Sequence, residues 1–335
     1  MTIKDISKAC GVSPSTVSKV LNGYTDISRD TVEQVFRAAE RMGYTPNAAA
    51  RLLKTNRSHN IGVLFVDQMQ SGLRHEYFSA VLNSVKEEAE AAGYDITFIS
   101  QKLGGSAMSY LDHCRYRKCD GVIIACVDFD DPGVMALIGS EIPVITVDHV
   151  FNQRGALISD NVRGMEELVT YLYGQGHRSI AYIHGEMTSV TQNRLAGFYR
   201  ACTRLGLQVP DTYIRAARYH DPDSSARATR ELLDQKDRPT CIIYPDDFSF
   251  LGGRSQLESM GLSIPEDISV AGYDGILLSQ ALRPALTTVL QDTDTLGRRS
   301  VQQLTEAIES PKTYVPRQEL IPGKLLPGAS VKKLL

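Results

Sequence analysis

The stretch that decides the fold is residues 2–22, TIKDISKACGVSPSTVSKVLN. Apolar side chains recur through residues 3–9 at helical spacing, so we expect a helix there with one buried face that includes Ala9. Thr2 stands where such a helix needs a cap, and Gly11 supplies the backbone freedom of a tight turn. A short capped helix should therefore be followed by a sharp change of direction.

A second helix is expected from Pro14 to about Leu21. Ser13 is a favourable cap, and proline suits the first helical position because no backbone N–H is needed there. Val17 and Val20 would face inward. The outward face is left with hydroxyl side chains and one cation: Ser15, Thr16, Ser18 and Lys19. This pattern matches a helix-turn-helix, whose second helix can lie in a DNA major groove, although an ordinary helical hairpin would share the spacing.

Two further elements are expected before the main body of the chain. Ser28 can cap a third helix that runs to about Met42 and ends at Gly43. Its buried stripe would consist of Val32, Val35, Phe36 and Ala39. Asn47 can cap a short Ala-rich helix, and the polar residues 54–60 then read as a linker.

The basic residues are concentrated in this N-terminal segment. Residues 1–58 carry nine Lys and Arg against five Asp and Glu, whereas the remainder carries 27 against 34. The net charge of the 335 residues is only −3, so the uneven distribution indicates a head that meets phosphate. The six cysteines form no C-x-x-C pair, and we expect reduced thiols, no metal site and no cofactor. No signal peptide or membrane-spanning run is expected.

From Asn60 onward the pattern changes to alternating strands and helices. Strands are expected over residues 61–66, 94–99, 121–125, 143–147, 179–183, 213–217, 240–244 and 268–272, with helices near 77–92, 190–205, 222–236 and 247–260. This alternation predicts two doubly wound α/β halves, each with a parallel sheet covered on both faces. Such sheets bind ligands at the carboxyl ends of their strands, in the crevice between the halves.

The N-terminal motifs closely resemble those of the LacI/GalR family of transcriptional repressors. They are Thr2-Ile3-Lys4-Asp5-Ile6, Gly11-Val12-Ser13, Thr16-Val17-Ser18, Leu21-Asn22 and Tyr44-Thr45-Pro46-Asn47. The resemblance implies three parts: a helix-turn-helix domain over residues 1–46, a hinge helix and linker over 47–59, and an effector-binding and dimerisation domain over 60–335. In the family, paired hinge helices enter the minor groove and a leucine from each kinks the DNA; Leu53 falls at that position.

The resemblance continues through the body to about Thr288. Its motifs include Arg194-Leu195-Ala196-Gly197-Phe198, Ile264-Pro265-x-Asp267-Ile268-Ser269-Val270 and Leu286-Thr287-Thr288. It implies a body that looks like a periplasmic sugar-binding protein. One loop departs from the family pattern: residues 67–77 replace a short Asn-Pro-Phe-Phe-like loop that borders the ligand cleft. Ligand identity therefore cannot be carried over from other members.

The candidate DNA contacts follow from the chemistry of the head and from the resemblance. Lys19 can reach guanine O6 and N7 in the major groove, and Ser15 and Thr16 can bond several base edges. The remaining candidates are expected to contact phosphate or to act in the hinge helix: Thr2, Ser13, Asn22, Tyr44, Arg51 and Leu53. A solvated surface lysine and plain helix-start hydroxyls are the alternatives to base contacts.

The candidate effector residues stand at or near strand ends in the body. Arg194 opens the Arg-x-x-Gly-Phe pattern, and the resemblance implies that it hydrogen-bonds a sugar hydroxyl or an effector carboxylate, which its planar fork suits. A structural salt bridge across the cleft is the alternative. Asp274, Asp148 and Asp246 each follow a strand, and three carboxylates with one arginine fit a polyhydroxyl ligand. Helix capping is the alternative for Asp148 and Asp246. His220 lies where the family often places a stacking aromatic residue.

The sequence offers little support for catalysis. It contains no Gly-x-Ser-x-Gly, no P-loop, and no Gly-x-Gly-x-x-Gly after the first strand of the body. The resemblance implies a cytoplasmic, sequence-specific repressor of carbohydrate-related genes, controlled by a sugar-like effector. One helix-turn-helix reads only a few base pairs, so we expect a homodimer on palindromic operator DNA. Some family members become tetramers through a C-terminal leucine heptad, but the prolines and glycines after Leu320 break any such heptad here. A free-standing sugar-binding protein and a sugar-processing enzyme are the alternatives.

Overall fold

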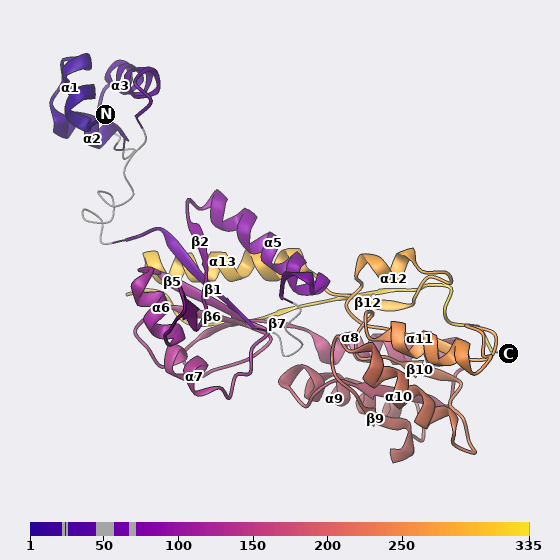
Figure 1. The fold of residues 1–335 in the computed structure, drawn as a ribbon. Helices are drawn as coiled ribbons and strands as arrows, with labels where there is room; N and C mark the ends of the chain where they lie inside the picture. The colour runs from indigo at the N-terminus through magenta and orange to yellow at the C-terminus, as the bar shows by residue number, and fades with distance from the viewer. Residues whose placement is uncertain (22–23, 25, 45–56, 67–71, 335) are drawn as a thin grey trace. The chain divides into compact units, whose positions relative to one another are not determined.

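The computed structural model describes residues 1–21, 24, 26–44, 57–66 and 72–334. These residues form two compact units, Met1–His59 and Asn60–Leu335, which we call the head and the body (Figure 1). The predicted hinge residues Arg51 and Leu53, and the predicted phosphate contact Asn22, lie outside the described residues.

The head consists of three short helices around a small apolar core. They are α1 (Ile3–Cys10), α2 (Pro14–Leu21) and α3 (Arg29–Arg41), as the capping pattern predicts. The Ser13 hydroxyl accepts the backbone N–H of Thr16 at 3.0 Å, which confirms its capping role. Gly11 ends the first helix with a left-handed φ of 63°, a conformation that glycine adopts without steric cost.

Two residues expected in this core are exposed instead. Ala9 faces solvent, and the neighbouring Cys10 is buried in its place. Phe36 is 50% exposed, because Val35, Ala38 and the adjacent Ala39 already fill the interior face of α3. The buried face of a short helix can thus include fewer residues than the apolar residues in its sequence suggest.

The first half of the body is a six-stranded parallel sheet with helices on both faces. The strand order is β13-β7-β6-β5-β1-β2. The strands are β1 (Asn60–Phe65), β2 (Asp95–Phe98), β5 (Gly121–Ala125), β6 (Val144–Val147), β7 (Gly155–Ser159) and β13 (Gln318–Ile321). One face is covered by α5 (Glu76–Ala91) and α13 (Thr293–Glu309), and the other by α6 (Tyr110–Tyr116) and α7 (Pro132–Ile138).

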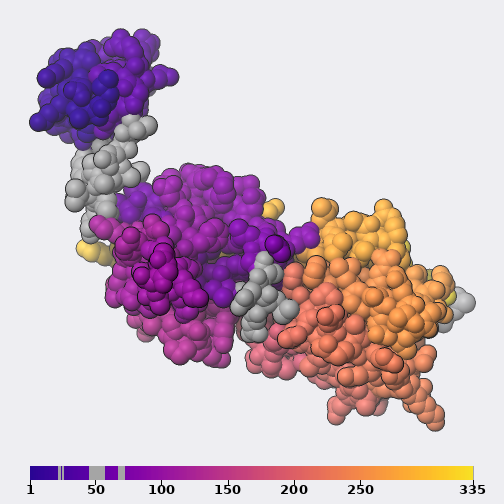
Figure 2. Space-filling model, in the orientation of Figure 1, coloured from indigo at the N-terminus to yellow at the C-terminus, as the bar shows by residue number. Residues whose placement is uncertain are grey.

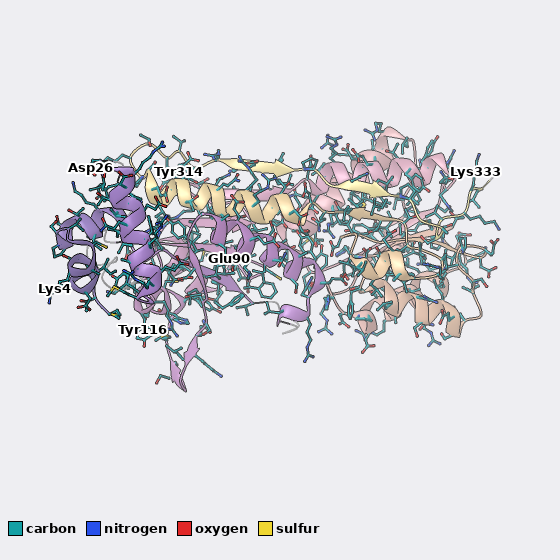
Figure 3. The ribbon with its side chains drawn as sticks, turned by 90° about the horizontal axis from the view of Figure 1, so that it is seen from above. Lys4, Asp26, Glu90, Tyr116, Tyr314 and Lys333 are labelled. Carbon is teal, nitrogen blue, oxygen red and sulfur yellow. The ribbon has the colours of Figure 1, made fainter. Side chains whose placement is uncertain are left out.

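Alternate residues of these strands point to opposite faces. Ile61 and Val63 join the core under α5 and α13, whereas Leu64 joins the core under α6 and α7. Between β2 and α6, a small hairpin of β3 (Lys102–Leu103) and β4 (Ser106–Ala107) projects from the body (Figure 3).

The second half is a four-stranded parallel sheet in the order β11-β10-β8-β9. Its strands are β8 (Ile180–His184), β9 (Ile214–Ala216), β10 (Cys241–Ile243) and β11 (Ser269–Ala271). The helices α8 (Asn161–Gly174) and α9 (Ser189–Arg204) cover one face, and α10 (Pro222–Leu233) and α11 (Phe250–Ser259) cover the other. Both sheets therefore have the doubly wound arrangement that the sequence predicts.

The chain passes between the two halves more than once. After β11 it forms α12 (Leu277–Ala281) and β12 (Thr288–Leu290), and then returns to the first half as α13. Strand β13 then joins the edge of the first sheet, and β14 (Lys324–Leu326) pairs with β12 in antiparallel fashion. Figure 3 shows the result: Tyr314 lies beside the first half, and Lys333 lies at the far end of the second. No helix of the described residues is long and apolar enough to cross a membrane.

Candidate functional site

A cavity of about 460 Å³ lies between the two halves of the body. The space-filling view shows these halves as two masses, purple to magenta and orange (Figure 2). The cavity walls come from the segments that follow β5, β6, β8, β9, β10 and β11, which places the cavity at the carboxyl ends of both sheets. All five predicted effector residues line it: Asp148, Arg194, His220, Asp246 and Asp274.

Arg194 is almost completely buried in the wall of the cavity, with 3% of its surface exposed. Its Nε donates to Asn161 Oδ1 at 2.8 Å, and one terminal nitrogen donates to the Pro245 carbonyl at 2.8 Å. The other terminal nitrogen lies 3.4 Å from Asp274 Oδ1, and the guanidinium carbon lies 3.6 Å from the centre of the Tyr273 ring. These contacts leave two of its five N–H groups for a ligand. The predicted salt bridge and the predicted ligand contact are therefore compatible.

Asp274 lies beside this guanidinium after β11. Its Oδ1 also accepts a hydrogen bond of 2.6 Å from Gln291 Nε2. Burial raises the pKa of its carboxyl to about 6, although Arg194 acts in the opposite direction. Its backbone has a φ of 100°, a strained value for a residue with a side chain, so the carboxylate is held in place by its surroundings.

Asp148 follows β6 and connects the two halves. Its carboxylate accepts the Ser159 N–H at 2.7 Å and the Tyr77 hydroxyl at 3.4 Å, while burial raises the pKa of the group. Its backbone carbonyl accepts a 2.7 Å hydrogen bond from the hydroxyl of Ser189, the first residue of α9. The cleft is thus bridged directly at its ligand-facing edge.

Asp246 is bound mainly by its own loop. Its two oxygens accept the backbone N–H and the hydroxyl of Ser249, each at 2.7 Å, and the N–H of His220 at 2.9 Å. The capping alternative is therefore part of its role. The neighbouring Asp247 is fully buried and accepts hydrogen bonds from the Thr288 hydroxyl and from the Ile276 N–H. Its side chain therefore contacts β12, to which Thr288 belongs.

His220 lies between two other rings. Its ring centre is 4.0 Å from that of Phe248 and 4.3 Å from that of His75, and both pairs are stacked. His75 belongs to the first half of the body and the other two belong to the second. This stack is a second connection across the cleft.

Sequence reasoning missed three of the side chains that complete the cavity wall. Gln291 follows β12, and its position beside Asp274 depends on a strand that no local pattern predicted. Phe129 and His149 follow β5 and β6, and their rings stack at 4.2 Å. Their position after predicted strands was the available signal. Within the described residues, no group of three or more His, Cys, Asp or Glu is arranged to hold a metal ion.

The head places most of its candidate DNA contacts at the surface. Ser13 and Ser15 are exposed, Thr16 is half-buried, and the hydroxyls of Ser13 and Thr16 lie 2.9 Å apart. Lys19 forms an ion pair of 2.5 Å with Asp26, which the sequence reading did not anticipate.

Two further candidates have contacts within the head. The Thr2 hydroxyl donates a hydrogen bond of 2.9 Å to the Asp5 carboxylate. In the absence of DNA, the hydroxyl is thus bound to a side chain of α1. Tyr44 packs partly against the core of the head.

Comparisons with known proteins agree with this architecture. Residues 2–47 match the family of bacterial regulatory proteins called the lacI family, and residues 169–331 match a periplasmic binding protein-like domain. An HTH-type transcriptional repressor PurR of Haemophilus influenzae is 31% identical over 342 residues, covering 100% of this chain and 99% of the relative. This chain belongs to the LacI family.

Two solved structures extend the similarity over nearly the whole fold. A lac repressor dimer bound to operator and the anti-inducer ONPF gives a TM-score of 0.78 at 26% identity, covering 99% of each chain. The transcriptional regulator CelR in a cellobiose complex gives 0.73 at 25% identity, covering 98% of this chain and 99% of that one. The protein is a DNA-binding transcriptional repressor of the LacI family, with a helix-turn-helix head and a periplasmic-binding-protein-like body.

Proposed function

We propose that this repressor is controlled by a small sugar-like effector that binds in the cavity of the body, and that it regulates carbohydrate-related genes. The observation that carries the proposal is the convergence of Arg194, Asp274 and Asp148, from both halves, on one cavity. Carboxylates and a guanidinium recognise hydroxyl groups by accepting and donating hydrogen bonds. The similar CelR structure contains cellobiose, which supports a ligand of this class.

Binding would act on DNA through the angle between the two halves. The Ser189–Asp148 hydrogen bond and the His75–His220 stack join the halves at the cavity, so a ligand that fits only one cleft width selects one arrangement. The carboxylates of Asp148, Asp246 and Asp274 are each held by hydrogen bonds from the protein, which suits recognition rather than proton transfer. We therefore propose a regulator and not an enzyme.

On the DNA side we propose a homodimer on a palindromic operator in the cytoplasm. A single helix-turn-helix reads few base pairs, so two heads related by a two-fold axis should read inverted half-sites. We assign base contacts to Ser15, Thr16 and Lys19, and a minor-groove wedge to Leu53. The wedge is tested by Leu53→Ala, which should weaken binding to operator in gel shifts far more than binding to random DNA. Equal losses of affinity for operator and for random DNA would show that Leu53 does not act as a wedge.

The effector proposal is tested by a thermal-shift screen of sugars and sugar derivatives against the full chain. A ligand that binds the folded state raises the melting temperature by mass action. A sugar that raises the melting temperature should also change the affinity of the protein for operator DNA. Both the thermal shift and the affinity change should disappear in Asp274→Ala but persist in Arg200→Ala. Arg200 lies on the same helix as Arg194, with an exposed side chain paired to Glu166. A panel in which only flat heterocycles such as nucleobases bind would refute the sugar-like effector.

A further inference from the structure

The charges around the cavity are strongly one-sided. Six carboxylate side chains and a single guanidinium, that of Arg194, line it among the described residues. The carboxylates are Asp128, Asp130, Asp148, Glu186, Asp246 and Asp274. The cavity therefore produces a negative potential, which low-dielectric walls strengthen.

The one guanidinium does not offset this charge for a ligand. Arg194 already lies against Asp274, and its Nε and one terminal nitrogen bind Asn161 and the Pro245 carbonyl. Its positive charge is thus largely matched inside the wall. An anionic ligand group on the two remaining N–H groups would lie beside the Asp274 carboxylate, which would repel it.

One histidine of the cavity supplies little positive charge. Burial lowers the pKa of His149, so its imidazole is mainly neutral near pH 7.

The acceptors of the cavity point to a ligand that donates hydrogen bonds. Gln291 is 5% exposed and lines the cavity, and its amide nitrogen donates to Asp274. A carboxylate only accepts hydrogen bonds, so a ligand that lies among six carboxylates is held by the donors that it presents to them.

The opposite wall combines an aromatic surface with carboxylates. Phe129 stacks on His149, and Asp128 and Asp130 flank Phe129 in the segment after β5. An aromatic face beside carboxylates suits the C–H face of a sugar ring and also an ammonium group, which is attracted by both. It offers nothing to a phosphate or a carboxylate.

We propose that the effector is a donor-rich polyhydroxyl compound that is uncharged or carries an ammonium group, and that the cavity rejects phosphorylated and carboxylated sugars. This inference rests on the proposed function, because it specifies the ligand of the same cavity. It separates neutral and ammonium-bearing sugars, which should bind, from anionic sugars, which should not. It also assigns Asp128 and Asp130 a role in that selection.

The test is calorimetry of the full chain with matched ligand sets. Each set contains a neutral hexose, its 2-amino-2-deoxy derivative, its uronate and its 6-phosphate, in the gluco, galacto and manno series. In the series that binds, the amine should bind at least as tightly as the parent, and the anions about a hundredfold more weakly, since opposed like charges cost several kcal/mol. An anion that binds as tightly as its parent overturns the inference and leaves the sugar effector standing. Failure of every member to bind counts against both.

Charge removal at the cavity gives a second readout. The double variant Asp128→Asn with Asp130→Asn should narrow the affinity ratio between a neutral sugar and its uronate, measured by competition. Asp95→Asn is the matched control, because Asp95 is an exposed carboxylate at the start of β2 and does not line the cavity. A ratio that changes equally in both variants, or in neither, would show that these carboxylates do not select the ligand.

Discussion

The head and the body each contain an ion pair between a candidate functional cation and a carboxylate, and the two pairs differ in burial. Lys19 and Asp26 lie 2.5 Å apart, and their side chains are 44% and 56% exposed. Arg194 and Asp274 lie 3.4 Å apart, but their side chains are only 4% and 10% exposed. The shorter contact is the weaker one, because water screens exposed charges and competes for their hydrogen bonds.

The difference suits the two tasks. A residue that reads DNA must exchange its partner for a base or phosphate, so an exposed lysine with a replaceable partner is adequate. A residue that recognises a small ligand must be positioned before the ligand arrives, because ordering it on binding would cost affinity. Arg194 is fixed by Asn161, Pro245 and Asp274 in advance.

The largest effect is expected when the buried pair is broken. Arg194→Ala leaves the Asp274 carboxylate without its cation and removes the Asn161 and Pro245 contacts. We expect the free energy of unfolding of the body to fall by about 3–5 kcal/mol, the usual cost of stranding a buried charge. Urea denaturation of the full chain, followed by a probe of the body, measures the loss.

The matched control for this change is Arg200→Ala on the same helix. Arg200 pairs with Glu166, but 68% of its side chain is exposed, so its removal should change the unfolding free energy little. Similar losses in the two variants would mean that burial does not distinguish the pairs.

A second prediction concerns pH. The pKa of Asp274 is raised to about 6, above the value of about 3.9 for an unfolded chain, so the native state holds a proton that the unfolded state has lost between these pH values. Its contribution to stability is therefore complete below about pH 4 and decreases as the pH rises through about 6, by up to about 3 kcal/mol.

The Asp274→Asn variant isolates this contribution. It cannot ionise at this position, and it also removes the charge that helps raise the pKa of the buried Asp247. The unfolding free energy of the wild type should therefore decline relative to that of the variant between about pH 4 and pH 7. Parallel pH profiles for the two proteins would show that the Asp274 carboxyl titrates normally in the folded state.

The sequence predicted the local features of both regions well. The capping residues and apolar spacing located the three head helices. Continuous apolar runs located all four strands of the second sheet and four of the six strands of the first, but not β7 or β13. The family's Arg-x-x-Gly-Phe pattern pointed to Arg194, and the rule that ligands bind at strand ends pointed to Asp274. Both residues line the same cavity.

Features that depend on distant parts of the chain were missed. Strand β13 pairs with β7 across about 160 residues of sequence, and no local pattern specifies that pairing. The position of Gln291 depends on β12, which connects the second half back to the first. The exposed Phe36 and the Lys19–Asp26 pair are also tertiary outcomes, decided by which neighbours fill a small core. Local periodicity cannot determine such choices.

The smallest effect is expected at the exposed pair. Lys19→Ala should weaken operator binding about tenfold and relax the base preference at one symmetric pair of operator positions, as for loss of one base-edge contact. Asp26→Ala keeps the lysine and removes only its partner inside the head, whose hydrogen bond raises the lysine pKa. Because DNA can replace that partner, Asp26→Ala should leave base preference unchanged and strengthen binding slightly at low salt. Titrations on operators substituted at each position, at two salt concentrations, separate the outcomes. If Lys19→Ala lowers affinity equally for every sequence and makes the salt dependence shallower, then Lys19 contacts phosphate.

If Asp26→Ala alters the base preference, then the ion pair itself positions the lysine, and the exposed pair would be as preorganised as the buried one.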